Sequence, residues 1–386
     1  MDFKLNDEQK AYQEAARQFG EKELAPHAAE WDEKKIFPKD VIRKAAATGF
    51  MGVYTREDVG GLNLGRLDAA IIFEELARCC TSTTAYITIH NMVTWMIDAY
   101  GNEATRKKFC PKMTSAELFG SYCLTEANSG SDAASLVTSA KKDGNEYVIN
   151  GSKVFVSGGG ETDVLVVMAR SGDDTPNGIS SFVVPSSLEG ISYGENEKKM
   201  GWNSQPTRVV NFDNVRIPES YLLGEEGMGF KIAMKGLDGG RINIGTCSIG
   251  CAQAALEAAQ KYMGERKQFG KSLNRFQALQ FKIADMLTEL IAARQMIRLA
   301  ASKLDSKEKT ASAYCAMAKR FATDVGFQVC NEALQIHGGY GYIKEYPLER
   351  YLRDSRVHQI LEGTNEIMRV IISRKILEEG ATELYK

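Results

Sequence analysis

The segment that decides the fold reads Tyr147-Val148-Ile149-Asn150-Gly151-Ser152-Lys153-Val154-Phe155-Val156-Ser157-Gly158. It contains two short runs of β-branched and aromatic residues, Tyr147–Ile149 and Val154–Val156, and such residues favour strands. Asn150-Gly151 lies between the two runs, and this dipeptide is typical of a two-residue hairpin turn. The segment therefore predicts a pair of antiparallel strands in the middle of the chain.

Further strand-like runs follow the first two, at Val164–Met168, Phe182–Val184 and Arg208–Phe212. No helical periodicity alternates with these runs, which argues against the parallel sheet of a Rossmann fold. The run Gly158–Gly160 is not followed by a helical segment, so it is not a dinucleotide-binding fingerprint. We therefore expect one antiparallel β domain here.

Helical patterns flank this β domain on both sides. Asn6 and Gln9 form a capping-box pattern near the N-terminus. Phe276–Leu304 and Lys309–His337 are long enough to form a helical bundle. The sequence thus predicts an α+β fold with three domains, which are an N-terminal helical domain over residues 1–120, a middle antiparallel β domain over 121–229 and a C-terminal helical bundle over 230–386.

Composition limits the class of protein and its partners. The 386 residues are 44% hydrophobic and 25% charged, as in a soluble globular protein. Since 48 basic and 50 acidic residues leave a net charge of -2, we expect no nucleic-acid partner. No apolar run reaches the roughly 18 residues that a membrane span needs, so we expect no membrane partner. The N-terminus has no signal or transit pattern, which favours the cytoplasm, or the mitochondrial matrix for a mature eukaryotic form.

The eight cysteines and four histidines are scattered along the chain. Their spacing matches neither a metal site nor a disulfide framework. We therefore expect free thiols and no metal ion.

A single carboxylate near the C-terminus stands in the unusual context Ile360-Leu361-Glu362-Gly363-Thr364-Asn365. The apolar pair before Glu362 suggests dry surroundings, which raise the pKa of a carboxyl group and make it a stronger base. Gly363 permits a sharp turn, and Thr364 then caps a helix from Asn365 to about Leu377. The alternative is an ordinary surface glutamate at a helix end.

Four motifs, in order along the chain, carry a resemblance to a known family. They are Tyr122-Cys123-Leu124-Thr125-Glu126-Ala127-Asn128-Ser129-Gly130-Ser131-Asp132, Gly151–Gly158, Glu265-Arg266-Lys267-Gln268-Phe269-Gly270 with Phe276 and Gln277, and Gln335-Ile336-His337-Gly338-Gly339-Tyr340-Gly341, which leads to Glu362. With these motifs the chain resembles the acyl-CoA dehydrogenases over essentially its whole length.

The resemblance implies FAD between the β domain and the C-terminal bundle. It assigns flavin contacts to the hydroxyls of Thr125 and Ser157, the pyrophosphate to Arg266, and a contact from a neighbouring subunit to Gln335–Gly339. The alternatives are hydroxyls that bond their own backbone, a solvated arginine and a glycine helix cap. The full set of implied FAD residues is Tyr122, Leu124, Thr125, Ser131, Phe155, Val156, Ser157, Arg266, Gln268, Phe269, Phe276, Gln277, Gln335, Ile336, Gly338, Gly339, Thr364 and Glu366.

The resemblance also implies the reaction. Glu362 matches the catalytic base, which removes the α-proton of an acyl-CoA while hydride leaves the β-carbon for flavin N5. A minority of the family has its base at the position of Gly240, where this chain has no carboxylate. The implied substrate-binding residues are Ser131, Asp238, Arg241, Gly363 and Arg374, although Arg241 is equally well interpreted as half of a buried ion pair.

Two positions depart from the commoner family pattern. Ala127-Asn128 stands where many members have Pro-Gly, so the conformation of that loop is open. Phe155 stands where the residue beside the flavin is often tryptophan, and phenylalanine can stack in the same way.

The expected substrate is a short acyl-CoA with a methyl branch at the α-carbon, isobutyryl-CoA first. Butyryl-CoA, 2-methylbutyryl-CoA and a three-carbon acyl-CoA stay open, because one methyl group is worth only about 1–3 kcal/mol in a pocket. Gly239-Gly240 suggests empty volume for a branch, or else close helix packing. Thr81–Asp98, expected to line the acyl end, contains no Arg or Lys, which argues against a diacid.

The resemblance implies a homotetramer that passes electrons to an electron-transferring flavoprotein. The chain has no haem-attachment motif or iron–sulfur cysteine cluster to carry electrons onward. A non-catalytic flavin-binding partner protein and an oxidase are the alternatives.

Overall fold

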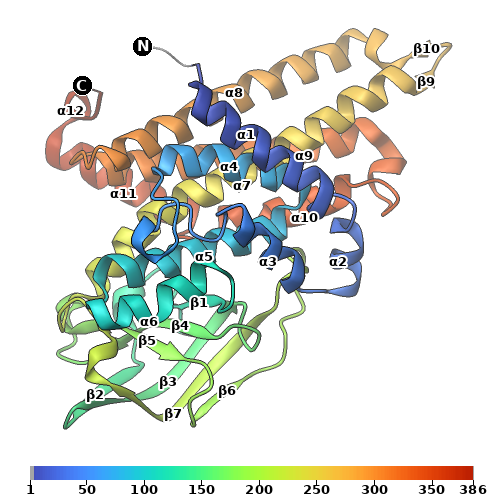
Figure 1. The fold of residues 1–386 in the computed structure, drawn as a ribbon. Coiled ribbons are helices and arrows are strands. Elements are labelled where there is room, and N and C mark those ends of the chain that lie inside the picture. The colour runs from blue at the N-terminus through green and yellow to red at the C-terminus, as the bar shows by residue number, and fades with distance from the viewer. Residues whose placement is uncertain (1–3, 386) are drawn as a thin grey trace.

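Helices from both ends of the chain form a layer that covers one side of a single β sheet (Figure 1). The structure is a computed structural model that describes residues 4–385. The N-terminal helices are α1 (Asp7–Phe19), α2 (Ala28–Lys34), α3 (Lys39–Ala47), α4 (Arg66–Cys79), α5 (Thr81–Tyr100) and α6 (Glu103–Thr114). The predicted capping box starts α1, since Gln9 N donates to Asn6 Oδ1 at 2.8 Å and Asn6 N donates to Gln9 Oε1 at 3.2 Å.

The β domain is one eight-stranded sheet in the order β6-β7-β3-β2-β4-β5-β8, with β1 also paired to β4. Its strands are β1 (Gly120–Cys123), β2 (Ser139–Asp143), β3 (Glu146–Ser157), β4 (Val164–Arg170), β5 (Ile179–Pro185), β6 (Ile191–Tyr193), β7 (Thr207–Pro218) and β8 (Leu222–Leu223). The prediction of a purely antiparallel domain is wrong, because β1 and β2 both pair with β4 in parallel. Parallel strands need a long connection between them, and the chain between β1 and β4, which includes β2 and β3, provides it.

The predicted hairpin at Asn150-Gly151 is wrong. These residues lie inside β3, which is a single 12-residue strand. The register against β7 shifts between Ile149 and Gly151, and Gly151 has a φ of 145°. The dipeptide therefore forms a bulge within a continuous strand. The turn from β2 to β3 is made by Gly144 and Asn145.

The C-terminal bundle is built on one very long helix. This helix, α7 (Gly229–Glu265), has 37 residues and is therefore about 55 Å long. The remaining elements are β9 (Lys267–Gln268), β10 (Lys271–Ser272), α8 (Gln277–Asp305), α9 (Ala311–His337), α10 (Leu348–Arg356), α11 (Asn365–Glu379) and α12 (Ala381–Tyr385). The β9–β10 hairpin was not predicted, and Figure 1 shows it at the end of the molecule away from the sheet.

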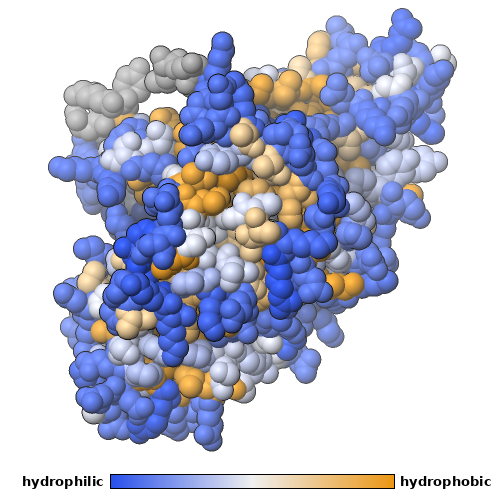
Figure 2. Space-filling view, viewed as in Figure 1, coloured by the Kyte–Doolittle hydropathy of each residue, from blue (hydrophilic) through white to orange (hydrophobic). Residues whose placement is uncertain are grey.

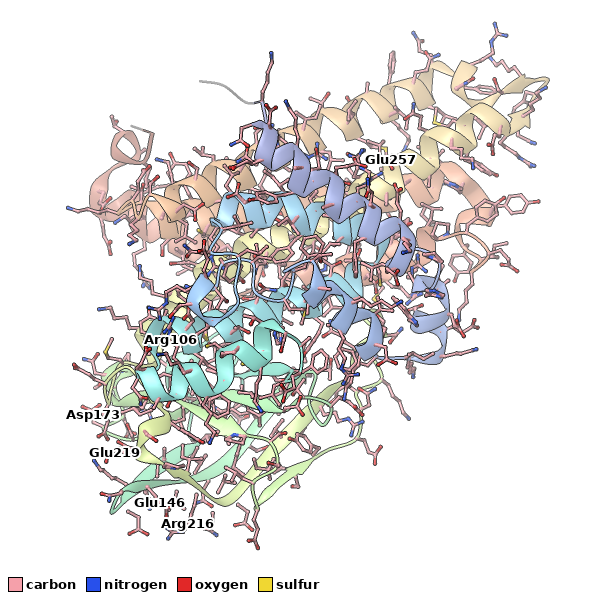
Figure 3. The ribbon with its side chains drawn as sticks, in the orientation of Figure 1. Arg106, Glu146, Asp173, Arg216, Glu219 and Glu257 are labelled. Carbon is pink, nitrogen blue, oxygen red and sulfur yellow. The ribbon has the colours of Figure 1, made fainter. Side chains whose placement is uncertain are left out.

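Buried side chains form a separate core in each part of the chain. One core joins α5 and α6 to the sheet, a second joins α7, α8 and α9, and a third lies among the N-terminal helices. Arg106, labelled in Figure 3, strengthens the α5–α6 contact because its Nε donates to buried Asp98 at 2.6 Å. On the far side of the sheet, the labelled pair Arg216 and Glu146 forms an exposed ion pair of 2.8 Å.

Four features of the structure concern its surface, its cysteines, membrane spans and metal ligands. On the face shown in Figure 2, hydrophobic residues gather in the helical layer, and the sheet side is mostly hydrophilic. All eight cysteines are buried free thiols. Within residues 4–385, no helix has the length and apolar character of a membrane span, and no cluster of potential ligands could hold a metal ion.

Candidate active site

Glu362 lies in a strained turn immediately before α11. Its φ is 57° and that of Gly363 is 88°, so two consecutive residues adopt the left-handed conformation. For a glutamate this conformation is unfavourable and persists only where the surroundings enforce it. As predicted, Thr364 caps α11, because its hydroxyl oxygen accepts a hydrogen bond from Ile367 N at 3.3 Å.

The carboxyl group of Glu362 rests on the backbone of Gly240 in α7. A Cβ atom at Gly240 would lie 2.3 Å from Glu362 Oε2 and 2.8 Å from its Cδ. The expectation that Gly240 leaves empty volume for a substrate branch is therefore wrong, because the carboxyl group of Glu362 fills that volume. The glycine is needed to seat the acid.

Burial makes Glu362 a stronger base than an exposed glutamate. The residue as a whole is part-buried, but its Oε2 is buried and has no hydrogen-bond partner in the described part of the chain. This burial raises the pKa of Glu362 to about 7, although the positive charges of Arg241 and Lys319 oppose the shift.

The apolar pair before Glu362 is only half buried. Ile360 is 51% exposed, whereas Leu361 is part-buried and packs against a cluster that includes Trp202. Glu362 instead faces α7 and two tyrosines, Tyr54 and Tyr122. Burial chiefly raises the pKa of both tyrosines, and the nearby Glu362 carboxylate raises it further.

Two buried basic side chains hold the Glu362 segment in place. Lys319 Nζ in α9 donates to Gly363 O at 2.8 Å and to Asn365 Oδ1 at 2.9 Å. His358 accepts from Trp202 Nε1 at 3.1 Å through its Nε2, so its Nδ1 donates to Ser248 Oγ at 2.6 Å. Burial chiefly lowers the pKa of Lys319 to about 7 and that of His358 to about 3. Neither residue was identified from sequence, because neither lies in a recognisable motif.

A buried pair of opposite charges flanks Gly239 and Gly240 on α7. Arg241 Nη1 and Asp238 Oδ1 are 2.8 Å apart in a buried ion pair, and Ser312 also donates to Asp238. The ion-pair interpretation of Arg241 is thus confirmed. Its Nε is buried without a partner among the described residues, so one donor of the guanidinium stays available to a ligand.

The residues expected at the flavin ring meet at the end of β3. Val154 N donates to Thr125 O at 2.8 Å, which places Thr125 beside Phe155 and Ser157. The β3 register shifts again between Lys153 and Val156, where Phe155 has a φ of 56° and a ring that is 67% exposed. A bulge that turns an aromatic ring outward between two hydroxyl groups suits a flat, polar-edged ligand such as a flavin.

A buried ion pair fixes this part of the sheet. Lys153 Nζ lies 2.7 Å from Glu126 Oε1 and also donates to Leu124 O at 2.9 Å. Lys153 is completely buried, and its pairing with Glu126 was not predicted, because no motif marks it. Tyr122 is part-buried with its hydroxyl unpartnered, whereas Leu124 and Val156 are buried.

The residues expected at the FAD pyrophosphate line a hollow of about 450 Å³ beyond the end of α7. Its lining includes Arg266, Gln268, Ile336, Gly338 and Gly339. Gly338 caps α9 with a φ of 59° and a ψ of -136°, and a Cβ at either glycine would meet open space. A guanidinium beside bare backbone fits phosphate oxygens.

Other implied ligand residues are exposed. They are Ser131 in the loop after β1, Phe269 at the β9–β10 turn, Gln277, Gln335, and Glu366 and Arg374 in α11, while Phe276 and Thr364 are part-buried. The structure therefore brings part of the predicted FAD set together in two groups, one at β3 and one beyond α7. Thr364 and Glu366, at the start of α11, belong to neither group.

Comparisons with known proteins identify the class. Family models for the N-terminal, middle and C-terminal domains of acyl-CoA dehydrogenase match residues 6–117, 121–215 and 227–377. The fold fits that class, whose members are FAD-dependent flavoprotein oxidoreductases. The chain belongs to the acyl-CoA dehydrogenase family, so the predicted family, α+β fold and FAD are confirmed.

Individual relatives match over nearly the whole chain. Mitochondrial isobutyryl-CoA dehydrogenase of Bos taurus is 56% identical over 97% of this chain and 90% of its own length. The enzyme of that name from Dictyostelium discoideum is 54% identical over the same shares. The solved structure of butyryl-CoA dehydrogenase from Megasphaera elsdenii is 38% identical, with a TM-score of 0.95 over 98% of this chain and 100% of that one.

Gly240→Ala tests the seat of the carboxyl group. The new Cβ would displace the end of the flexible Glu362 side chain and leave the fold intact. Since a misplacement of about 1 Å can cost about 100-fold in rate, we expect anaerobic flavin reduction by an acyl-CoA to slow by at least tenfold. Gly264→Ala is the matched control on α7, because its Cβ would have no neighbour closer than 3.9 Å. A native rate in Gly240→Ala would contradict this role of the glycine.

Proposed function

We propose that the protein catalyses the α,β-dehydrogenation of a short acyl-CoA. The first expected substrate is isobutyryl-CoA, which would be converted to methacrylyl-CoA. The alternative substrate is butyryl-CoA, whose product would be a straight-chain 2-enoyl-CoA. The observation that carries this proposal is the buried, unpartnered carboxyl of Glu362, whose pKa is raised to about 7. Such a group suits abstraction of a proton from a weak carbon acid near neutral pH.

In this proposal Glu362 is the catalytic base that removes the α-proton. The thioester carbonyl must be polarised for this step, and the backbone N–H of Glu362 donates to no group among the described residues. That N–H is therefore free to donate to the carbonyl oxygen as charge develops there. FAD, when bound, accepts the hydride that leaves the β-carbon. Lys319 and His358 keep the carboxyl on Gly240 throughout.

We assign FAD contacts to the two groups of residues on different copies of the chain. Thr125, Phe155 and Ser157 would contact the flavin ring, and Arg266 with Gly338–Gly339 would hold the pyrophosphate. The hollow is lined by Tyr262 and Arg266 at the C-terminal end of α7, and Figure 1 shows that this end of the helix lies away from the sheet. A second copy could present its hollow to FAD held at this sheet, which favours an assembly such as the expected homotetramer.

The relatives support the choice of substrate. Gly240 no longer argues for a branched chain, so the support comes from the 56% and 54% identity to isobutyryl-CoA dehydrogenases. An electron-transferring flavoprotein as the acceptor fits the family. The location of the protein, in the cytoplasm or the mitochondrial matrix, stays a prediction. The similar enzyme of Bos taurus is mitochondrial.

A substrate series tests the proposed reaction. Isobutyryl-, 2-methylbutyryl-, butyryl- and octanoyl-CoA are compared with electron-transferring flavoprotein as the acceptor. We expect the highest kcat/KM for isobutyryl-CoA, and a preference of about 10-fold or more over octanoyl-CoA because each methylene counts in a tight pocket. A butyryl preference would move the protein to the straight-chain dehydrogenases, and an octanoyl preference would refute a short acyl pocket.

Arg266→Ala tests the proposed FAD site. Loss of the guanidinium removes a phosphate contact, so we expect FAD per chain to fall well below that of the native protein and the assembly to weaken. Absorbance of the purified protein gives FAD content, and sedimentation gives the assembly state. Lys267→Ala is the matched control, since it removes a neighbouring charge that does not line the hollow. Full FAD occupancy in Arg266→Ala would contradict the assignment.

A further inference from the structure

Arg66, the first residue of α4, has a buried guanidinium without an ion pair. The residue is only 7% exposed, and its Nη1 is buried with no hydrogen-bond partner in the described part of the chain. Asp305 is occupied elsewhere, because it accepts from the backbone N–H of Arg66 at 2.7 Å and from that of Leu67 at 3.0 Å. Since an unpaired buried cation is costly, its presence here requires an explanation.

Two aromatic rings hold the guanidinium in place. Its central carbon lies 3.5 Å from the centroid of the Tyr54 ring and 5.1 Å from that of Trp95. Attraction between a cation and a ring face offsets part of the cost of burial. The stack therefore keeps Arg66 fixed without a carboxylate, and it leaves Nη1 unpartnered.

The guanidinium and the base lie over neighbouring residues of α7. A Cβ at Gly239 would come within 2.4 Å of Arg66 Nη1, just as a Cβ at Gly240 would come within 2.3 Å of Glu362 Oε2. Consecutive Cα atoms are about 3.8 Å apart, although consecutive positions of a helix point in different directions. The two groups therefore lie close to neighbouring points on α7. Tyr54 connects them, because Arg66 lowers and Glu362 raises the pKa of its hydroxyl, which burial chiefly raises.

The expectation drawn from Thr81–Asp98 covered only that stretch, which contains no Arg or Lys. Arg66 belongs to α4 and lies 5.1 Å from the ring centroid of Trp95, so a cation does lie beside that stretch. An acyl group whose α-carbon touches Glu362 meets Arg66 and Tyr54 a few bonds further on. A long chain would collide with the Arg66 side chain, which its stack on Tyr54 holds in place.

We propose that Arg66 is a specificity-determining residue, whose guanidinium closes the acyl end of the site against long chains. This inference rests on the proposed function and adds the residue that limits chain length. A short acyl group fits between Glu362 and the stack of Arg66 on Tyr54. A longer one is excluded by the volume of the Arg66 side chain.

Arg66→Ala and Arg66→Met test the inference together. We expect Arg66→Ala to raise the ratio of kcat/KM for octanoyl-CoA over isobutyryl-CoA by about 10-fold or more, because a wall is removed. Arg66→Met keeps most of the side-chain length and should raise the ratio less. Calorimetric Kd values for the same thioesters are a readout that needs no turnover, and FAD content with Tm confirms that each variant is folded.

Several outcomes would overturn the inference. One is a ratio in Arg66→Ala within about twofold of the native ratio. Another is a native preference for glutaryl-CoA over butyryl-CoA that Arg66→Ala abolishes, since Arg66 would then bind a carboxylate. If Arg66→Ala does not fold, the Kd values of the native protein still test the inference. Equal Kd values for octanoyl-CoA and butyryl-CoA would show that the acyl end of the site is not closed. Failure of the native protein to reduce its flavin with any short acyl-CoA would instead refute the proposed function.

Discussion

The contact between the carboxyl group of Glu362 and the bare backbone of Gly240 is the constraint on which the site depends. The contact buries one carboxyl oxygen without a partner, and this burial raises the pKa of Glu362 to about 7. A side chain at position 240 could not occupy the same space. The acid is thus kept dry by the absence of a side chain on the opposing helix, and not by an apolar side chain beside it in sequence.

The long helix α7 connects this contact to the rest of the molecule. Its first residues pack on the sheet, where a Cβ at Gly229 would lie 2.3 Å from the backbone of Ser180. Its middle carries Gly239 and Gly240, and its end leads to Arg266 and the hollow. One rigid element therefore relates the base, the sheet that holds Phe155 and the proposed pyrophosphate site. Two contacts hold the strained turn of Glu362: Lys319 in α9 donates to Gly363 O, and Ser248 in α7 accepts from His358, which lies four residues before Glu362.

Local sequence signals predicted the local structure well. The capping residues Asn6 and Thr364 begin the helices that they were expected to begin, because caps depend on neighbours within one turn. Family motifs gave the fold and the cofactor. The prediction of a hairpin at Asn150-Gly151 was wrong because a bulge within a strand favours the same residues as a tight turn. Only the pairing of the strand with β7 distinguishes the two.

Contacts between distant residues could not be predicted from one sequence. Lys153 pairs with Glu126, His358 bonds Ser248, and Arg66 stacks on Tyr54, and none of these pairs has a characteristic spacing. The roles of Gly239 and Gly240 were misjudged for the same reason, since what fills the space above a glycine comes from another element. The parts of the site that a motif does not mark are those made by tertiary packing.

The rate of anaerobic flavin reduction by isobutyryl-CoA, measured against pH in the native protein and in Glu362→Gln, tests the role of Glu362 most directly. Only the deprotonated carboxyl can accept the α-proton, and its pKa is raised to about 7. The native rate should therefore be low in acid and should rise as the pH passes through about 7. Glu362→Gln, with full FAD and intact acyl-CoA binding, should show no reduction at any pH. Flavin reduction at a near-native rate in that variant would contradict the assignment of Glu362 as the base.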